Sequence, residues 1–183
     1  AVLFIQFPPL AKNVISASKE VASLFLVIFS VGVAIGSVAV NHLLKGTVSA
    51  RFAPIAVIVM AGFVVAFWFV ARIWPVPTEG PLLDVPQFLS VPMAYPLLAA
   101  LLGIAVAGGM FVVPLYAFLT TRVAPEQASR TIAANNIVNS GAMVGGAVLA
   151  MGLTAIGIGI TDQVLMSAGM CLISAWLGNM LYQ

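Results

Sequence analysis

The stretch VASLFLVIFSVGVAIGSVAVNHLL, residues 21–44, contains no aspartate, glutamate, lysine or arginine. Four further stretches share this property, and they comprise residues 52–71, 85–121, 131–161 and 163–183. Each is long enough for a helix of about 20 apolar residues, which is what the hydrocarbon core of a bilayer requires. The sequence therefore predicts a polytopic membrane protein.

The composition supports the same prediction independently. Hydrophobic residues make up 62% of the 183 residues and charged residues only 7%, whereas a soluble domain carries about 25% charged residues. The net charge of +2 comes from a few loop lysines and arginines, so it indicates membrane orientation, and we expect no nucleic-acid partner. The single cysteine, Cys171, allows neither an intrachain disulfide nor a zinc-site pattern. We expect no metal and no cofactor.

The charged islands divide the chain into six hydrophobic segments. Helix is favoured over strand because most of these segments far exceed the roughly 10 residues of a barrel strand and show no polar alternation. The expected fold class is all-α, a single transmembrane domain over residues 1–183, with helices at 1–12, 21–44, 52–73, 92–121, 131–158 and 162–181. The first helix is expected to be truncated, because the chain begins and ends in apolar stretches, as a piece of a larger protein would.

Prolines predict where these helices are interrupted. Five prolines lie within residues 74–92, a density that is incompatible with a regular helix, so residues 74–91 are expected to form an external loop. Pro8, Pro9 and Pro114 lie inside predicted helices, which we expect them to kink.

The charged loop residues predict an orientation, because lysine and arginine near helix ends are retained in the cytoplasm. Alternate loops must lie on the same side of the membrane. One set of loops carries four basic residues and one acidic residue: Lys45, Arg51, Arg122, Glu126 and Arg130. The other set carries three basic and four acidic residues: Lys12, Lys19, Glu20, Arg72, Glu79, Asp84 and Asp162. We therefore expect the first set, and both ends of the chain, to be cytoplasmic.

Glycines are concentrated inside the predicted membrane segments. The clearest groups are Gly32-x-x-x-Gly36, Gly103 with Gly108-Gly109, and Gly141-x-x-x-Gly145-Gly146. In lipid, small residues let helix backbones approach closely, so that dispersion contacts accumulate. The pattern fits static packing and also fits helix faces that slide during transport.

Asn135, Asn136 and Asn139 give the sharpest polar signal in the predicted membrane segments. At about 100° per residue, they share one face of a helix. Unpaired amides facing lipid are costly, so this face should point into protein or into a water-filled cavity. Hydrogen bonds between helices and the lining of a cavity both explain the pattern, and three carboxamides on one face favour recognition of a polar headgroup. Gln6 and Tyr116 are further candidates for such a cavity.

The five acidic residues all lie in loops or at helix ends. Proton-coupled transporters commonly place an aspartate or glutamate at membrane depth, so a proton carrier would have to lie elsewhere in a larger protein. Neither a Ser, His and acid constellation nor a carboxylate pair suggests intramembrane catalysis. We expect that this segment is not an enzyme.

Two sequence patterns resemble a transporter family. GSVAVNHLLKG, residues 36–46, followed by Arg51, looks like a degenerate copy of the major facilitator signature. The residues that carry this loop motif are Gly36, Asn41, Lys45, Gly46 and Arg51, with Asn41 where an aspartate is usual. GGMFVVPL, residues 108–115, together with residues 131–143, is similar to the C-terminal half of bacterial lysophospholipid transporters of the same superfamily. The similarity covers most of the chain and is most specific from Gly103 to Met143.

The resemblance implies a function and a cellular location. It implies a six-helix half of a major facilitator fold in the bacterial inner membrane, which moves lysophospholipid by alternating access against an N-terminal six-helix half. The first, second, fourth and fifth segments would line the cavity, and related transporter regions occur fused to acyltransferase and acyl-carrier-protein synthetase domains. A drug or metabolite exporter is the alternative within the class. A non-transporting membrane anchor or assembly subunit is the alternative from a different class.

Overall fold

The computed structural model describes residues 2–44, 53–75, 81–121 and 125–180. All regular elements in these ranges are helices, apart from one isolated bridge between Ala17 and Leu83. The helices are α1 (Val2–Asn13), α2 (Lys19–Leu43), α3 (Ala53–Arg72), α4 (Val85–Ser90), α5 (Ala94–Thr121), α6 (Pro125–Ala155) and α7 (Ile160–Met180). The all-helical fold class predicted from the sequence is confirmed.

Four of the described helices are long and apolar enough to cross a membrane. Their membrane-length segments are Lys19–Leu43, Pro54–Arg72, Ala94–Ala117 and Glu126–Ala155. α7 contains a shorter apolar stretch, Ile160–Ile173, and α1 has 12 residues, fewer than the roughly 20 that a span requires. The chain is therefore an all-helical protein with the character of a membrane protein. A bundle of six spans stays a prediction.

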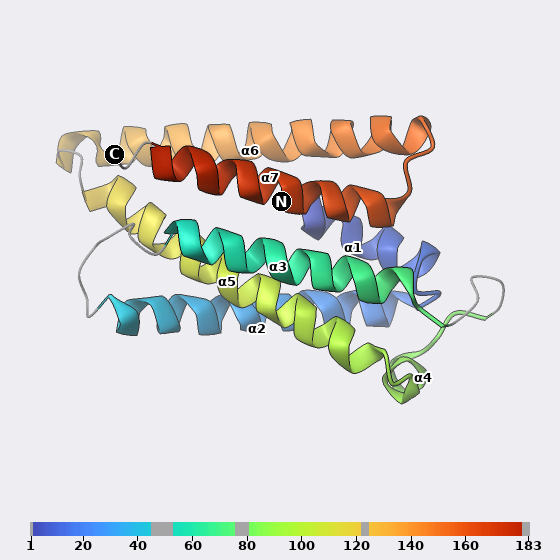
Figure 1. The fold of residues 1–183 in the computed structure, drawn as a ribbon. Helices are drawn as coiled ribbons and strands as arrows, with labels where there is room; N and C mark the ends of the chain where they lie inside the picture. Colours follow the sequence, from blue (N-terminus) through green and yellow to red (C-terminus); the bar gives the residue numbers. More distant parts are fainter. Residues whose placement is uncertain (1, 45–52, 76–80, 122–124, 181–183) are drawn as a thin grey trace.

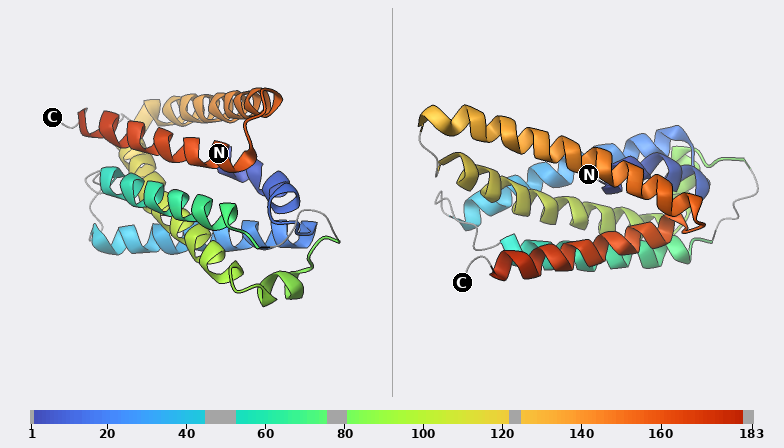
Figure 2. Two further views of the ribbon diagram at one scale, coloured as in Figure 1. Left: turned by 45° about the vertical axis from the view of Figure 1, so that its right-hand side comes forward. Right: turned by 90° about the horizontal axis from the view of Figure 1, so that it is seen from above.

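The helices lie side by side as a bundle (Figures 1 and 2). α5 packs against both α2 and α3, and α3 packs against α7. α2, α5 and α7 begin at the end of the bundle where α1, α3 and α6 finish (Figure 1). The helix ends on either side of alternate connections thus lie at the same end of the bundle, as the predicted orientation requires. Which end faces the cytoplasm stays a prediction.

The contact between α2 and α5 is a close approach of two backbones. A Cβ atom on Gly32 would lie 2.5 Å from the Cβ of Ala105, and a Cβ atom on Gly36 would overlap the main-chain carbonyl of Val106. Real Cβ contacts are not this short, so only glycine fits these two positions without moving α5. The Gly32-x-x-x-Gly36 pattern therefore serves packing inside the chain.

The other glycine groups differ from one another in whether they take part in this contact. Gly109 on α5 completes the same contact, because a Cβ atom there would overlap the carbonyl of Val33 on α2. Gly141 and Gly145 on α6 have the same four-residue spacing, yet a Cβ atom on either would meet nothing within 4 Å. Identical spacing thus marks a packed interface on α2 and an open face on α6.

Aromatic side chains fill the core at the end of the bundle where α2 begins. Phe25 of α2 packs edge to face against Phe88 of α4, with ring centroids 5.8 Å apart. Trp74 stacks on Phe88 at 5.6 Å, and its Nε1 donates a hydrogen bond to the carbonyl of Ile15 at 3.1 Å. These contacts hold α4 against the start of α2.

α4 corrects the expectation that residues 74–91 form a loop without regular helix. Pro86 lies in the first turn of α4, where a missing N–H breaks no intrahelical hydrogen bond. The main-chain N–H of Asp84 donates a hydrogen bond to the side-chain oxygen of Gln87 at 3.0 Å, and Phe88 is fully buried. Proline density alone was therefore a poor guide, because proline disrupts a helix interior and is compatible with a helix start.

Four helices begin two or more residues away from their predicted positions. α2 begins at Lys19 and not at 21, and α7 begins at Ile160 and not at 162. α6 starts at Pro125, six residues before the predicted start at 131, because the prediction used charges as boundaries, whereas Glu126 and Arg130 lie inside the first turns of the helix. α5 starts at Ala94 and not at Pro92. α1 continues as helix through Pro8 and Pro9, and α5 continues through Pro114. Kinks at these three prolines stay predictions.

The glycine contacts yield a test of the α2–α5 interface. Gly36→Ala should destabilise the protein by about 1–3 kcal/mol, because the new methyl group meets a carbonyl that cannot rotate away. Gly141→Ala is the matched control and should leave stability unchanged or raise it by about 1 kcal/mol, because alanine favours helix and the site is open. Thermal unfolding of both variants in detergent makes the comparison. Equal stability of the two variants would contradict the close approach.

Candidate functional site

A groove of about 550 Å³ lies between α5 and α6. α5 contributes an apolar wall with one phenol, formed by Phe111, Val112, Leu115 and Tyr116. α6 contributes Asn135, Asn136 and Asn139. Four of the five residues that the sequence put forward as cavity candidates therefore line one groove.

Helical geometry explains why the three asparagines face the groove together. At about 100° per residue, Asn139 lies about 40° and Asn136 about 100° around the axis of α6 from Asn135, so all three fall within a sector of about 100°. The opposite sector carries exposed aliphatic side chains, among them Ile137 and Val144. α6 thus presents amides to the groove and hydrocarbon to the other side.

The asparagine side chains have unused hydrogen-bonding capacity. Asn135 is half-buried, and Asn136 and Asn139 are exposed. Among the described residues, none of the three carboxamides has a hydrogen-bonding partner. A carboxamide offers two N–H donors and one carbonyl acceptor, and leaving these unpaired in hydrocarbon would be costly. Of the two explanations open at the level of sequence, cavity lining fits this arrangement better than hydrogen bonding between helices.

Gln6, the fifth cavity candidate, does not line this groove. Its Nε2 donates a hydrogen bond to the Oε1 of Gln163 on α7 at 2.6 Å, and both side chains are buried. The Nε2 of Gln163 donates in turn to Thr154 Oγ1 at 2.8 Å and to the carbonyl of Ile158 at 3.1 Å. The network joins α1 to the turn between α6 and α7.

The same turn has a defined backbone geometry. Gly157 has a positive φ of 88°, which glycine adopts without strain. The N–H of Gly157 bonds the carbonyl of Thr154, and the N–H of Ile158 bonds that of Leu153, the pattern of a Schellman helix end. The Nε2 of Gln163 then donates a hydrogen bond to the carbonyl of Ile158. The sequence analysis missed Gln163. The available signal was its position as a polar residue directly after Asp162, which was taken only as the start of the last helix.

The residues of the expected loop motif are only partly described. Gly36 lies in the α2–α5 interface, and Asn41 is exposed near the end of α2. Lys45, Gly46 and Arg51 lie outside the described residues.

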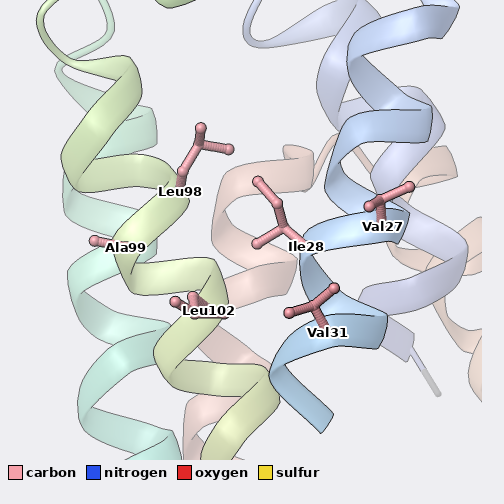
Figure 3. Close-up of a pocket in the computed structure, with 6 residues that line it drawn as sticks. All are labelled: Val27, Ile28, Val31, Leu98, Ala99 and Leu102. Carbon is pink, nitrogen blue, oxygen red and sulfur yellow. The ribbon is translucent and has the colours of Figure 1, made fainter. Parts of the chain in front are cut away.

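A second hollow, of about 320 Å³, lies between α2 and α5. Figure 3 shows Ile28 pointing from α2 toward the α5 side of this hollow. Its lining residues are Val27, Ile28, Val31, Leu98, Ala99 and Leu102. It offers shape but no hydrogen-bonding group, so it carries no chemistry of its own.

The described ranges contain no group of three or more His, Cys, Asp or Glu side chains that could hold a metal ion. Comparison of the chain with protein-family models, curated proteins and solved structures found no significant match.

The glutamine network yields a second test. Gln163→Leu removes the acceptor of Gln6 and should cost about 1–2 kcal/mol of stability, because a buried amide loses its partner. The double variant Gln6→Leu/Gln163→Leu should recover part of this loss, since no orphaned amide remains. Thermal unfolding in detergent measures both, with Gln127→Leu at the exposed start of α6 as control. The single variant Gln6→Leu completes the comparison. A double variant whose loss of stability equals the sum of the losses in Gln6→Leu and Gln163→Leu would refute the direct bond.

Proposed function

We propose that this protein takes part in the transport of an amphipathic lipid, a lysophospholipid, across a bacterial inner membrane. The observation that carries the proposal is the two-sided lining of the α5–α6 groove. One wall is apolar, with Val112 and Leu115, and the other carries three carboxamides. A lysophospholipid has the same division, because an apolar chain adjoins a polar headgroup.

The apolar character of the two lining helices supports this assignment. Both lining helices contain membrane-length segments, and α5 carries no charged residue over Ala94–Thr121. Carboxamides in this setting need water or a polar ligand, because facing lipid would leave them unpaired. A groove that hydrates a headgroup while the chain remains in apolar surroundings meets both requirements.

The proposal extends to the mechanism of transport. In alternating access, the bundle would rock against a second six-helix half around a site near the bilayer midplane. The resemblance of Gly103–Met143 to the C-terminal half of lysophospholipid transporters supports this arrangement, with both ends of the segment in the cytoplasm. None of the described groove residues is an Asp, Glu or His, so the proposed movement follows the lipid gradient without proton coupling by these residues.

The two alternatives make different predictions. A drug or metabolite exporter would show flux that depends on a proton gradient, carried by an acidic residue elsewhere in a larger protein. A non-transporting anchor would use the open face of α6, where Gly141 and Gly145 meet nothing, to hold a neighbouring protein. Its function would survive loss of the asparagines.

Uptake of labelled lysophospholipid into proteoliposomes that contain the full-length protein tests the proposal. Uptake should occur with and without a proton gradient, and Asn136→Ala should lower it about fivefold or more, since losing a hydrogen-bonding partner of the headgroup costs about 1–3 kcal/mol. Asn13→Ala, at the exposed end of α1, is the matched control and should keep full uptake.

Two outcomes would overturn this function. One is the absence of uptake under both conditions by a folded protein that still binds lysophospholipid. The other is uptake that Asn136→Ala and Asn13→Ala affect equally, because the lipid would then take a path that avoids the groove.

A further inference from the structure

α6 is the least buried of the membrane-length helices. The described residues bury only 6% of its membrane-length window, against 28% in α2, 33% in α3 and 39% in α5, and α6 lies along one edge of the bundle (Figure 1). A Cβ atom on Gly141 or Gly145, in the middle of α6, would meet nothing within 4 Å among the described residues. Little packing therefore fixes the distance between the middle of α6 and α5.

The C-terminal end of α6, in contrast, is held by one buried amide. The Nε2 of Gln163, in the first turn of α7, donates to Thr154 Oγ1 at 2.8 Å and to the carbonyl of Ile158 at 3.1 Å. Its Oε1 accepts a hydrogen bond from the Nε2 of Gln6 at 2.6 Å. A single side chain thus joins the last turn of α6, the turn that follows it and α1.

The hydrogen bonds leave the amide of Gln163 only one orientation. The hydroxyl of Thr154 donates its proton to the carbonyl of Ala150 at 2.9 Å, so it can only accept from Gln163, and the carbonyl of Ile158 is an acceptor as well. Both N–H groups of Gln163 therefore point toward α6 and the turn, and its oxygen points toward Gln6. Gln163 is 3% exposed and Gln6 is 5% exposed, so little water reaches a bond that is broken.

The groove lies far along α6 from this amide. Asn139 is 16 residues before Ala155, at which α6 ends, or about 24 Å away at a rise of about 1.5 Å per residue. A tilt of about 5° at the turn would therefore move Asn139 by about 2 Å. Hydrogen-bond distances span only about 2.7–3.2 Å, so this movement would separate the carboxamides from a ligand held against the α5 wall.

We propose that Gln163 is a positioning residue that sets the width of the α5–α6 groove, because it clamps the C-terminal end of α6 to α1. The pivot is the turn at Gly157, whose positive φ of 88° a glycine adopts and changes without strain. When the hydrogen bonds of Gln163 break, α6 tilts about this turn and its middle changes its distance from α5. The inference concerns the groove whatever its ligand, and only its bearing on uptake rests on the proposed function.

Distances between two spin labels test the clamp in the full-length protein in nanodiscs, with its native cysteines replaced. Val113 on α5 carries one label, and the second is placed at Val138 in the middle of α6, at Met151 near the turn, or at Ile58 on α3; all four positions are exposed. Gln163→Met keeps the length of the side chain and removes its hydrogen bonds. It should shift or broaden the Val113–Val138 distance by at least about 2 Å. The Val113–Met151 distance should change by no more than about a third as much, because Met151 is closer to the pivot, and the Val113–Ile58 distance should stay unchanged.

A second variant reaches the same clamp from α6. Thr154→Val keeps the shape of the side chain and removes one acceptor of Gln163, so it should give the same pattern with a smaller change. Gln127→Met, at the exposed start of α6, is the matched control and should leave all three distances unchanged. Size-exclusion profiles check folding, and Thr154→Val carries the test if Gln163→Met aggregates.

Two results would overturn the inference. One is an unchanged Val113–Val138 distance in whichever of the two clamp variants folds. The other is an equal change in all three distances, including Val113–Ile58, because Gln163 would then stabilise the whole bundle and not position α6. Absence of lysophospholipid uptake by the unaltered protein would sink the transport proposal and leave these distances, and the clamp, as they are.

Discussion

The backbone contact between α2 and α5 is the interaction on which the rest of the bundle depends. Lipid offers little apolar driving force between helices, so association relies on close packing. Gly32 and Gly36 supply this by bringing α2 against the backbone of α5 near Ala105 and Val106. The next turns of α5, residues 111–116, form the apolar wall of the groove with α6. A side chain at either glycine would displace α5, so the position of that wall depends on a contact that lies outside the groove.

Hydropathy was sufficient to predict the long helices, because a polar backbone in hydrocarbon must pair with itself and helix does this within one segment. It was insufficient for their ends. Charge marks the edge of the hydrocarbon, whereas a helix ends where its hydrogen bonds end, and α6 continues through Glu126 and Arg130 to begin at Pro125. The same distinction explains α4, since Pro86 breaks no bond in a first turn. Charge and proline content are thus indirect indicators of helix boundaries.

The candidate site was predictable to the extent that it is local. Periodicity alone places the three asparagines of α6 on one face, and Tyr116 was among the further cavity candidates. The α5 wall of the groove depends on how α5 is rotated about its own axis, and the sequence of α5 alone does not determine this rotation. Gln6 shows the limit clearly, because its partner Gln163 is 157 residues away. A glutamine in an apolar segment predicts some polar partner, and only the fold determines which one.

α6 is the most exposed of the membrane-length helices, and its two sides differ in polarity. The described helices bury only 6% of its membrane-length window, and it touches the bundle lightly, through α1, α5 and α7. The network around Gln163 fixes its C-terminal end, while its middle faces α5 across the groove. One sector of α6, with Ile137 and Val144, suits hydrocarbon, and the sector with the asparagines does not. A membrane-length helix that needs a different surrounding on each side separates lipid from a polar space. That requirement, more than the identity of any one asparagine, is why the groove is the place to look for a substrate.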